Sequence, residues 1–212
     1  MTEVDSGLLD VLKVERAAYH ESGHIVAAAR KGFALCAAGM HIYRNGCGRS
    51  FYTKPESVFR PEPGSVAEDR VFAMVITLIS GLLAQREKFP ECSNLSGMAD
   101  EQEINLYLDG IYPGVMEARA AARNDLEIRS KKLVQENWFA IEELAKVLLA
   151  KDWAPRQEEA DPWWPDCRDE KTLDGKTIED VLVQLNVPAS LDVVTIDCGS
   201  VPHPTHRVQV AD

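Results

Sequence analysis

The sequence predicts a mainly α-helical domain that carries a small β-hairpin. Helix-forming stretches with apolar residues at helical spacing fill most of the chain, and one glycine-containing turn is flanked by residues typical of strands. With 212 residues, of which 45% are hydrophobic, the chain suits one compact domain with an appendage. We therefore expect a domain over residues 1–187 and a peripheral C-terminal tail over residues 188–212.

The first predicted helix covers residues 8–30. Its residues are good helix formers, its apolar positions recur at loosely helical spacing, and Gly32 supplies a stop signal just beyond it. A break in this helix near Val14 is compatible with the pattern.

Residues 38–53 have the composition of a hairpin. The turn is Asn45-Gly46-Cys47-Gly48, and it is flanked by His41-Ile42-Tyr43 and Ser50-Phe51-Tyr52. We expect a two-stranded element, with His41 as an ordinary strand residue; the alternative is that His41 faces the site and donates a hydrogen bond to a substrate or intermediate. Exposed strand edges bind extended peptides through main-chain hydrogen bonds, so the hairpin is the candidate platform for a peptide substrate.

The middle of the chain predicts further helices. Ser65 and Glu68 form a capping box for a helix that runs to about Lys88. Its apolar run, residues 71–84, is too short to cross a bilayer, so we expect a buried helix and no membrane span. The helical pattern resumes near Ala99, pauses at residues 110–114 and continues to about Lys151, which indicates two helices or one bent helix.

The last part of the chain is less regular. Residues 152–170 combine prolines, acidic residues and the adjacent Trp163 and Trp164, which is typical of an irregular insertion. Thr177 and Asp180 are candidate caps for a short final helix through Leu185. The tail histidines, His203 and His206, are interpreted as exposed residues without a metal.

Charge and cysteine content exclude several classes of function. The chain has 34 acidic and 23 basic residues and a net charge of -11, which repels phosphate backbones, so nucleic acid is excluded as a partner. Its five cysteines are an odd number without a C-x-x-C pair, which argues against a disulfide framework. The N-terminal residues carry no secretion signal, and we expect a cytoplasmic location.

One motif indicates chemistry. Residues 20–24, His-Glu-Ser-Gly-His, form an H-E-x-x-H motif inside the first predicted helix. Because residues four apart share a helix face, His20 and His24 can bind one zinc ion, with Glu21 at the adjacent edge. Zinc lowers the pKa of a bound water, and a nearby carboxylate can accept its proton as the water attacks a carbonyl. The alternative is a pair of neutral core histidines without a metal.

A catalytic zinc site needs a third protein ligand from another part of the chain. The metzincin extension is excluded, because Ala27 and Arg30 stand where that motif has glycine and histidine. The candidates are carboxylates on later predicted helices: Glu68, Asp69, Glu87, Asp100, Glu101 and Glu103.

Four segments, in order along the chain, carry a resemblance to a known family. They are A-Y-H-E-S-G-H at residues 18–24, I-S-G-L-L-A at 79–84, S-G-M-A-D-E-Q-E-I at 96–104 and K-T-L-D-G at 171–175. These segments resemble motifs of the peptidase domain of FtsH-type zinc metalloproteases, an ATP-dependent, membrane-associated family. The resemblance covers roughly residues 17–185.

The resemblance implies a helical zincin-like metallopeptidase domain of the FtsH type. It implies His20, His24 and Asp100 as zinc ligands and Glu21 as general base, with Glu101 and Glu103 as alternatives for the third ligand. Peptides or unfolded proteins are the implied substrates. A homo-oligomeric assembly is left open.

The sequence also departs from the family. The family's AAA ATPase module and transmembrane helices would precede the peptidase domain, whereas the motif here begins at residue 20. We therefore expect a zinc metalloendopeptidase that is ATP-independent as a single chain, or that works with an unfoldase partner in trans. The alternative is a non-proteolytic binding or regulatory module with a structural or absent metal. Glu21 favours catalysis, because a merely structural site does not need it.

Overall fold

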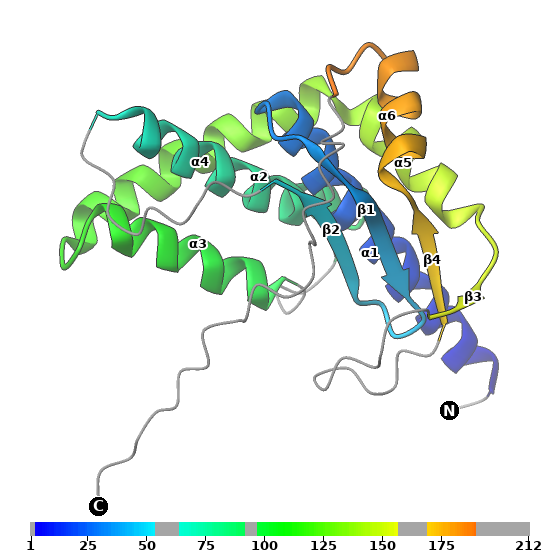
Figure 1. The fold of residues 1–212 in the computed structure, drawn as a ribbon. Helices are drawn as coiled ribbons and strands as arrows, with labels where there is room; N and C mark the ends of the chain where they lie inside the picture. Colours follow the sequence, from blue (N-terminus) through cyan, green and yellow to red (C-terminus); the bar gives the residue numbers. More distant parts are fainter. Residues whose placement is uncertain (1–2, 54–63, 92–96, 157–168, 190–212) are drawn as a thin grey trace, which may run out of the picture.

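The computed structural model describes residues 3–53, 64–91, 97–156 and 169–189. In these segments the chain is mainly helical, as predicted, and carries one antiparallel sheet (Figure 1). The helices are α1 (Glu3–Arg30), α2 (Val66–Lys88), α3 (Met98–Ile111), α4 (Met116–Glu136), α5 (Trp138–Leu149) and α6 (Gly175–Gln184). The strands are β1 (Leu35–Tyr43), β2 (Gly48–Tyr52), β3 (Ala154–Pro155) and β4 (Asp169–Leu173).

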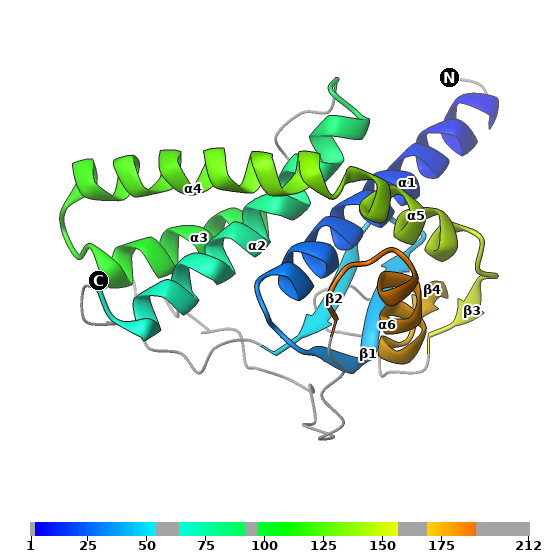
Figure 2. The same ribbon diagram turned by 90° about the horizontal axis from the view of Figure 1, so that it is seen from above.

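The central element is α1, which packs against the sheet and against α2, α4 and α5 (Figure 2). It is continuous, so the break considered near Val14 is wrong. Val14 packs against the core, and tertiary packing of this kind overrides the weak helix propensity of a β-branched residue. The predicted stop is confirmed: Gly32 has φ 77°, and the amide of Phe33 donates to the carbonyl of Ala28, as in a Schellman motif.

The helices α1 and α2 approach each other closely at Gly23. A Cβ atom at this position would lie 2.7 Å from the Cβ of Ala84 and 2.8 Å from the carbonyl oxygen of Ser80. The α2 residues around this crossing are buried, as predicted for residues 71–84. None of the helices in the described segments is long and apolar enough to span a membrane.

The predicted hairpin is confirmed, but the sheet is larger than predicted. Strands β1 and β2 pair antiparallel around a turn in which Gly46 has φ 85°. The expectation of only two strands was wrong, because β4 pairs with the other side of β1 and β3 pairs with β4. The sequence did not reveal β4 because it is short and polar, with only Glu170 and Leu173 buried. Residues 154–155 and 169–170, assigned to the irregular insertion, are therefore strand residues.

The helix boundaries agree with the sequence in part. Ser65 accepts a hydrogen bond from the amide of Glu68 (3.2 Å) at the start of α2, as predicted. The helical pattern that ends near Lys151 left two helices or one bent helix open. After the pause the structure has two helices, α4 and α5, which are separated at Asn137, and α3 precedes the pause. The cap of α6 was wrongly assigned: Asp174, and not Thr177 or Asp180, is the N-cap, and it accepts from the amide of Thr177 (2.7 Å).

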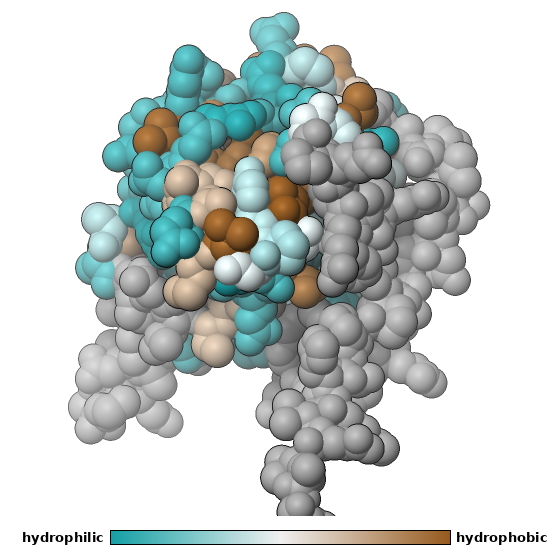
Figure 3. Space-filling view, turned by 90° about the vertical axis from the view of Figure 1, so that its left-hand side faces the viewer, coloured by the Kyte–Doolittle hydropathy of each residue, from teal (hydrophilic) through white to brown (hydrophobic). Residues whose placement is uncertain are grey.

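Several expectations concern residues outside the described segments. These are Trp163, Trp164, His203, His206 and almost all of the tail. The described segments contain two of the cysteines: Cys36 is buried and Cys47 is partly buried. On the end of the molecule to which α2, α3 and α4 contribute, apolar residues are interspersed with hydrophilic ones (Figure 3). The homo-oligomer that the sequence left open stays untested.

We expect Gly23→Ala to destabilise the protein, because its methyl group would collide with backbone and Cβ atoms of α2. Overpacking of this kind costs about 1–3 kcal/mol in the free energy of unfolding, which urea denaturation followed by circular dichroism would measure. Ala120→Ser, which adds one atom at an exposed position of α4, is the control and should change stability little. Equal stability of the two variants would contradict the close crossing.

Candidate metal centre

Three side chains from two helices converge on one point in the structure. His20 and His24 come from α1 and Asp100 comes from the first turn of α3. The Nε2 atoms of His20 and His24 are 2.9 Å apart, and Asp100 Oδ2 lies 2.8 Å from the first and 3.5 Å from the second. The structure thus brings together the three residues predicted as ligands, as the one group in the described segments with the spacing of a metal site.

The donor atoms of this group fit a zinc ion. Ligand atoms 2.0–2.1 Å from a tetrahedral zinc are about 3.4 Å apart, and the three separations here lie near that value or somewhat below it. Two imidazole nitrogens and one carboxylate oxygen also match catalytic zinc sites, which have three protein ligands and one open position.

The orientation of His24 is fixed by α2. Its Nδ1 donates a hydrogen bond to the carbonyl oxygen of Thr77 (3.0 Å), and since a carbonyl only accepts, the hydrogen lies on Nδ1. The lone pair of the neutral ring is therefore at Nε2, the nitrogen that faces His20 and Asp100. Gly81 leaves the space for this ring, because a Cβ atom there would lie 2.3 Å from its Cε1. Thr77 and Gly81 were not predicted from the sequence.

The charges in this group depend on one another. Burial lowers the pKa of His24, but the charge and hydrogen bond of Asp100, the charge of Glu21 and the hydrogen bond to Thr77 together raise it more, and the resulting pKa is about 9. Burial conversely raises the pKa of Asp100, but the two histidines hold it well below its usual range. The group without metal therefore holds a proton on His24 at neutral pH, next to an ionised Asp100.

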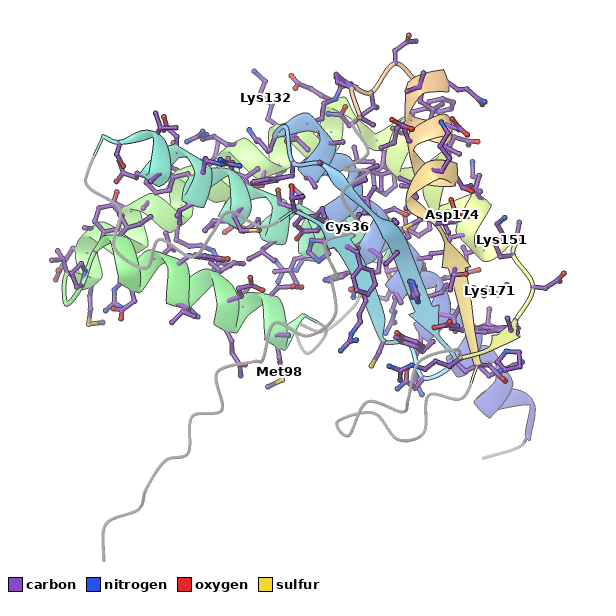
Figure 4. The ribbon with its side chains drawn as sticks, viewed as in Figure 1. Cys36, Met98, Lys132, Lys151, Lys171 and Asp174 are labelled. Carbon is purple, nitrogen blue, oxygen red and sulfur yellow. The ribbon has the colours of Figure 1, made fainter. Side chains whose placement is uncertain are left out.

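The start of α3 selects Asp100 from the neighbouring acids. Gly97 precedes the helix with φ 92° and lies against Leu82 of α2, where a Cβ atom would be within 2.1 Å of the side chain. Met98 is exposed and points away from the helices (Figure 4), whereas Asp100 faces the histidines.

The other candidate acids form contacts elsewhere or lie outside the three-residue group. Glu101 pairs with Arg123 (2.8 Å), Glu103 accepts from Tyr107 (3.2 Å), and Glu68 accepts from the amide of Gly64 (2.6 Å). Asp69 and Glu87 are not part of the three-residue group.

The carboxylate of Glu21 faces the hairpin. Ser50 of β2 donates a hydrogen bond to Glu21 Oε2 (2.5 Å). Gly48 of the same strand lies so close that a Cβ atom there would be 2.5 Å from Oε1. Glu21 is 5% exposed, so these contacts fix a buried carboxylate, whose charge also helps to raise the pKa of His24. The sequence placed Ser50 in the predicted hairpin but did not indicate that its side chain contacts Glu21.

Tyr52 is a second residue that the sequence did not indicate. It lies two positions after Ser50, so both side chains share one face of β2. Burial, together with the charges of Glu103, Asp100 and Glu21, raises the pKa of Tyr52 well above its ordinary value. Its phenol therefore stays protonated near the site. His41 is an ordinary strand residue, as expected: its ring bonds Glu170 (3.1 Å) and the carbonyl of Ala38 (2.9 Å).

Comparisons with known proteins add nothing to this geometry. The sequence matches no model of a known protein family, and no curated protein matches it significantly. The resemblance to FtsH-type peptidases therefore stays a prediction, and the arrangement of the side chains carries the functional argument.

We expect the metal-free chain to bind one zinc ion, and His20→Ala and Asp100→Asn each to weaken binding at least a hundredfold. Each variant removes one of three ligands, whereas losing even an outer partner of a ligand typically costs about 10–100-fold. Competition with a chelator would measure the affinities, and Glu101→Gln, which alters the acid paired with Arg123, is the control. Unchanged zinc affinity in the Asp100 variant would move the third ligand to another acid.

Zinc binding should also depend on pH in a defined direction. Because the pKa of His24 is about 9, binding at pH 7 must displace a proton from the free protein. The apparent affinity should rise about tenfold per pH unit up to about pH 9 and then level off. Titration calorimetry in buffers of different ionisation enthalpy would count the released proton, and release of none at pH 7 would contradict the charge assignment.

Proposed function

We propose that the protein is a zinc-dependent metalloendopeptidase of the helical zincin-like type, which hydrolyses peptide bonds without ATP as a single chain. The observation that carries this proposal is the buried group of His20, His24 and Asp100 with a separately held Glu21 beside it. A purely structural metal site would not need a fourth, hydrogen-bonded carboxylate at its edge. The proposal therefore favours catalysis over a binding module of the same fold.

Each residue has a defined task in this proposal. His20, His24 and Asp100 would hold the ion, which when bound lowers the pKa of a water and polarises the peptide carbonyl. Glu21 accepts the proton of the attacking water and later delivers it to the leaving amine. Ser50 donates to Oε2 and so fixes the orientation of the Glu21 carboxylate. Because Ser50 only orients Glu21, it is a positioning residue.

The sheet offers a place for an extended substrate. The strand order is β2-β1-β4-β3, so within the described segments the outer edge of β2 has no strand partner. Ser50 lies in the middle of β2 and contacts Glu21, so this edge runs beside the proposed base. A peptide that adds to the edge as a further strand would pass the site in extended form. Flexible peptides and unfolded segments can adopt this form, whereas folded proteins would need an unfoldase partner in trans.

We expect the purified chain, loaded with zinc, to cleave an unfolded substrate such as casein, and Glu21→Gln to lower the rate at least a hundredfold. The amide cannot accept the proton, and loss of a general base costs about 10²–10⁴-fold. Zinc content, measured by elemental analysis, should stay near one ion per chain in the variant.

The matched control is Glu15→Gln, which makes the same change on α1 away from the site and should leave the rate within twofold. If Glu21→Gln kept activity within a few-fold of the wild type, Glu21 would not be the base. If the zinc-loaded wild type cleaved no unfolded protein, the peptidase assignment would be wrong.

A further inference from the structure

A second candidate site lies in a cavity between the C-terminal end of α1 and α4, and none of its lining residues belongs to the metal group. The cavity has a volume of about 480 Å³. Its lining residues are Arg30, Lys31, Arg129, Lys132, Leu133, Glu136 and Asn137. Four of these seven side chains are cationic and one is acidic, in a chain whose net charge is -11. The cavity is therefore positively charged, although the chain as a whole is negatively charged.

The cations in this cavity are only partly neutralised by the described part of the chain. Lys31 has no ion pair with a described residue, and Arg30 donates to the neutral amide oxygen of Asn137 (2.6 Å). Arg129 and Lys132 each contact one acid, Asp125 (3.4 Å) and Glu136 (3.7 Å), within their own helix. Partial burial, together with the charge of Arg129, lowers the pKa of Lys31. The cations in this cavity therefore repel one another, and a bound anion would reduce this repulsion.

We propose that this cavity binds a small phosphate-bearing molecule. Arginine forks and lysine ammonium groups are the side chains that bind phosphate oxygens, and this cavity supplies two of each. Its size fits a diphosphate or a small phosphorylated metabolite, whereas the negative charge of the rest of the chain disfavours a long polyanion. Lys132 extends from α4 at the upper edge of the molecule, where solvent reaches it (Figure 4).

The cavity is distinct from the metal group but shares a helix with it. Arg30 follows His24 by six residues, which is about 9 Å along α1. A bound anion would join the end of α1 to α4 through the four cations. The proposal does not rest on the peptidase assignment, because none of the lining residues belongs to the metal group or contacts Glu21.

The test is a calorimetric titration of the full-length, metal-free chain with inorganic pyrophosphate at low salt. We expect saturable binding that Lys31→Gln and Arg129→Gln each weaken about tenfold, the effect of one lost charge-assisted hydrogen bond. Both substitutions relieve repulsion between cations, so the variants should fold, which circular dichroism checks. Lys176→Gln is the control, because this lysine is paired with Glu179 and Asp180 on α6, and it should change the affinity less than twofold.

Absence of binding to the wild type, or wild-type affinity in the Lys31 and Arg129 variants, would overturn the proposal. Tighter binding of a deca-glutamate peptide would also overturn it and would indicate an acidic protein partner. The variant His20→Ala should bind pyrophosphate as the wild type does. Loss of binding in that variant would place the anion at the metal group instead. The titration does not measure cleavage of casein, so the anion-binding proposal and the peptidase proposal can be contradicted independently of each other.

Discussion

The mutual neutralisation of Asp100 and the two histidines of α1 is the interaction on which the arrangement of the site depends. A carboxylate that is largely removed from water is stable only next to a positive partner or with several hydrogen bonds. Here the partner is an imidazole that is itself held by the main chain of α2. Three helices are thereby tied to one point, because α1 brings the rings, α2 orients one of them and α3 brings the acid. In the metal-bound form that we propose, the ion would replace the proton on His24 as the positive partner of Asp100.

The fold around this point is built for close approach. Glycine occurs where α1 crosses α2, where α2 passes under the ring of His24, and where β2 passes the carboxylate of Glu21. At each of these places even one additional carbon atom would collide with a neighbouring residue. The site is thus positioned by backbone segments that lie nearly in contact, which keeps its side chains buried with little freedom to turn.

The sequence predicted the parts of this structure that depend on local patterns. Helical spacing identified α1 and α2, the glycine-containing turn identified the hairpin, and the spacing of His20 and His24 placed both rings on one face. The sequence could not predict β4, because Asp169–Leu173 alternates too weakly and pairs with a strand far away in the chain. It also could not show that Ser50 meets Glu21 or that Thr77 meets His24. Such contacts depend on how helices and strands pack together, which no local pattern encodes. Asp100 was predicted as the third ligand only through the family resemblance, because the sequence alone left six acids as candidates.

Both imidazole rings of the proposed metal centre lie on a single uninterrupted helix, and this has a consequence for how the site can come apart. A slip of α1 by one residue would rotate it by about 100° and would swing both rings out of register at the same moment. The backbone of α1 thus fixes the spacing of the two rings, and one ring can leave the group by rotating its side chain while the helix stays intact. Asp100 lies on a different helix, so movement of α3 would remove the acid and leave the two rings together.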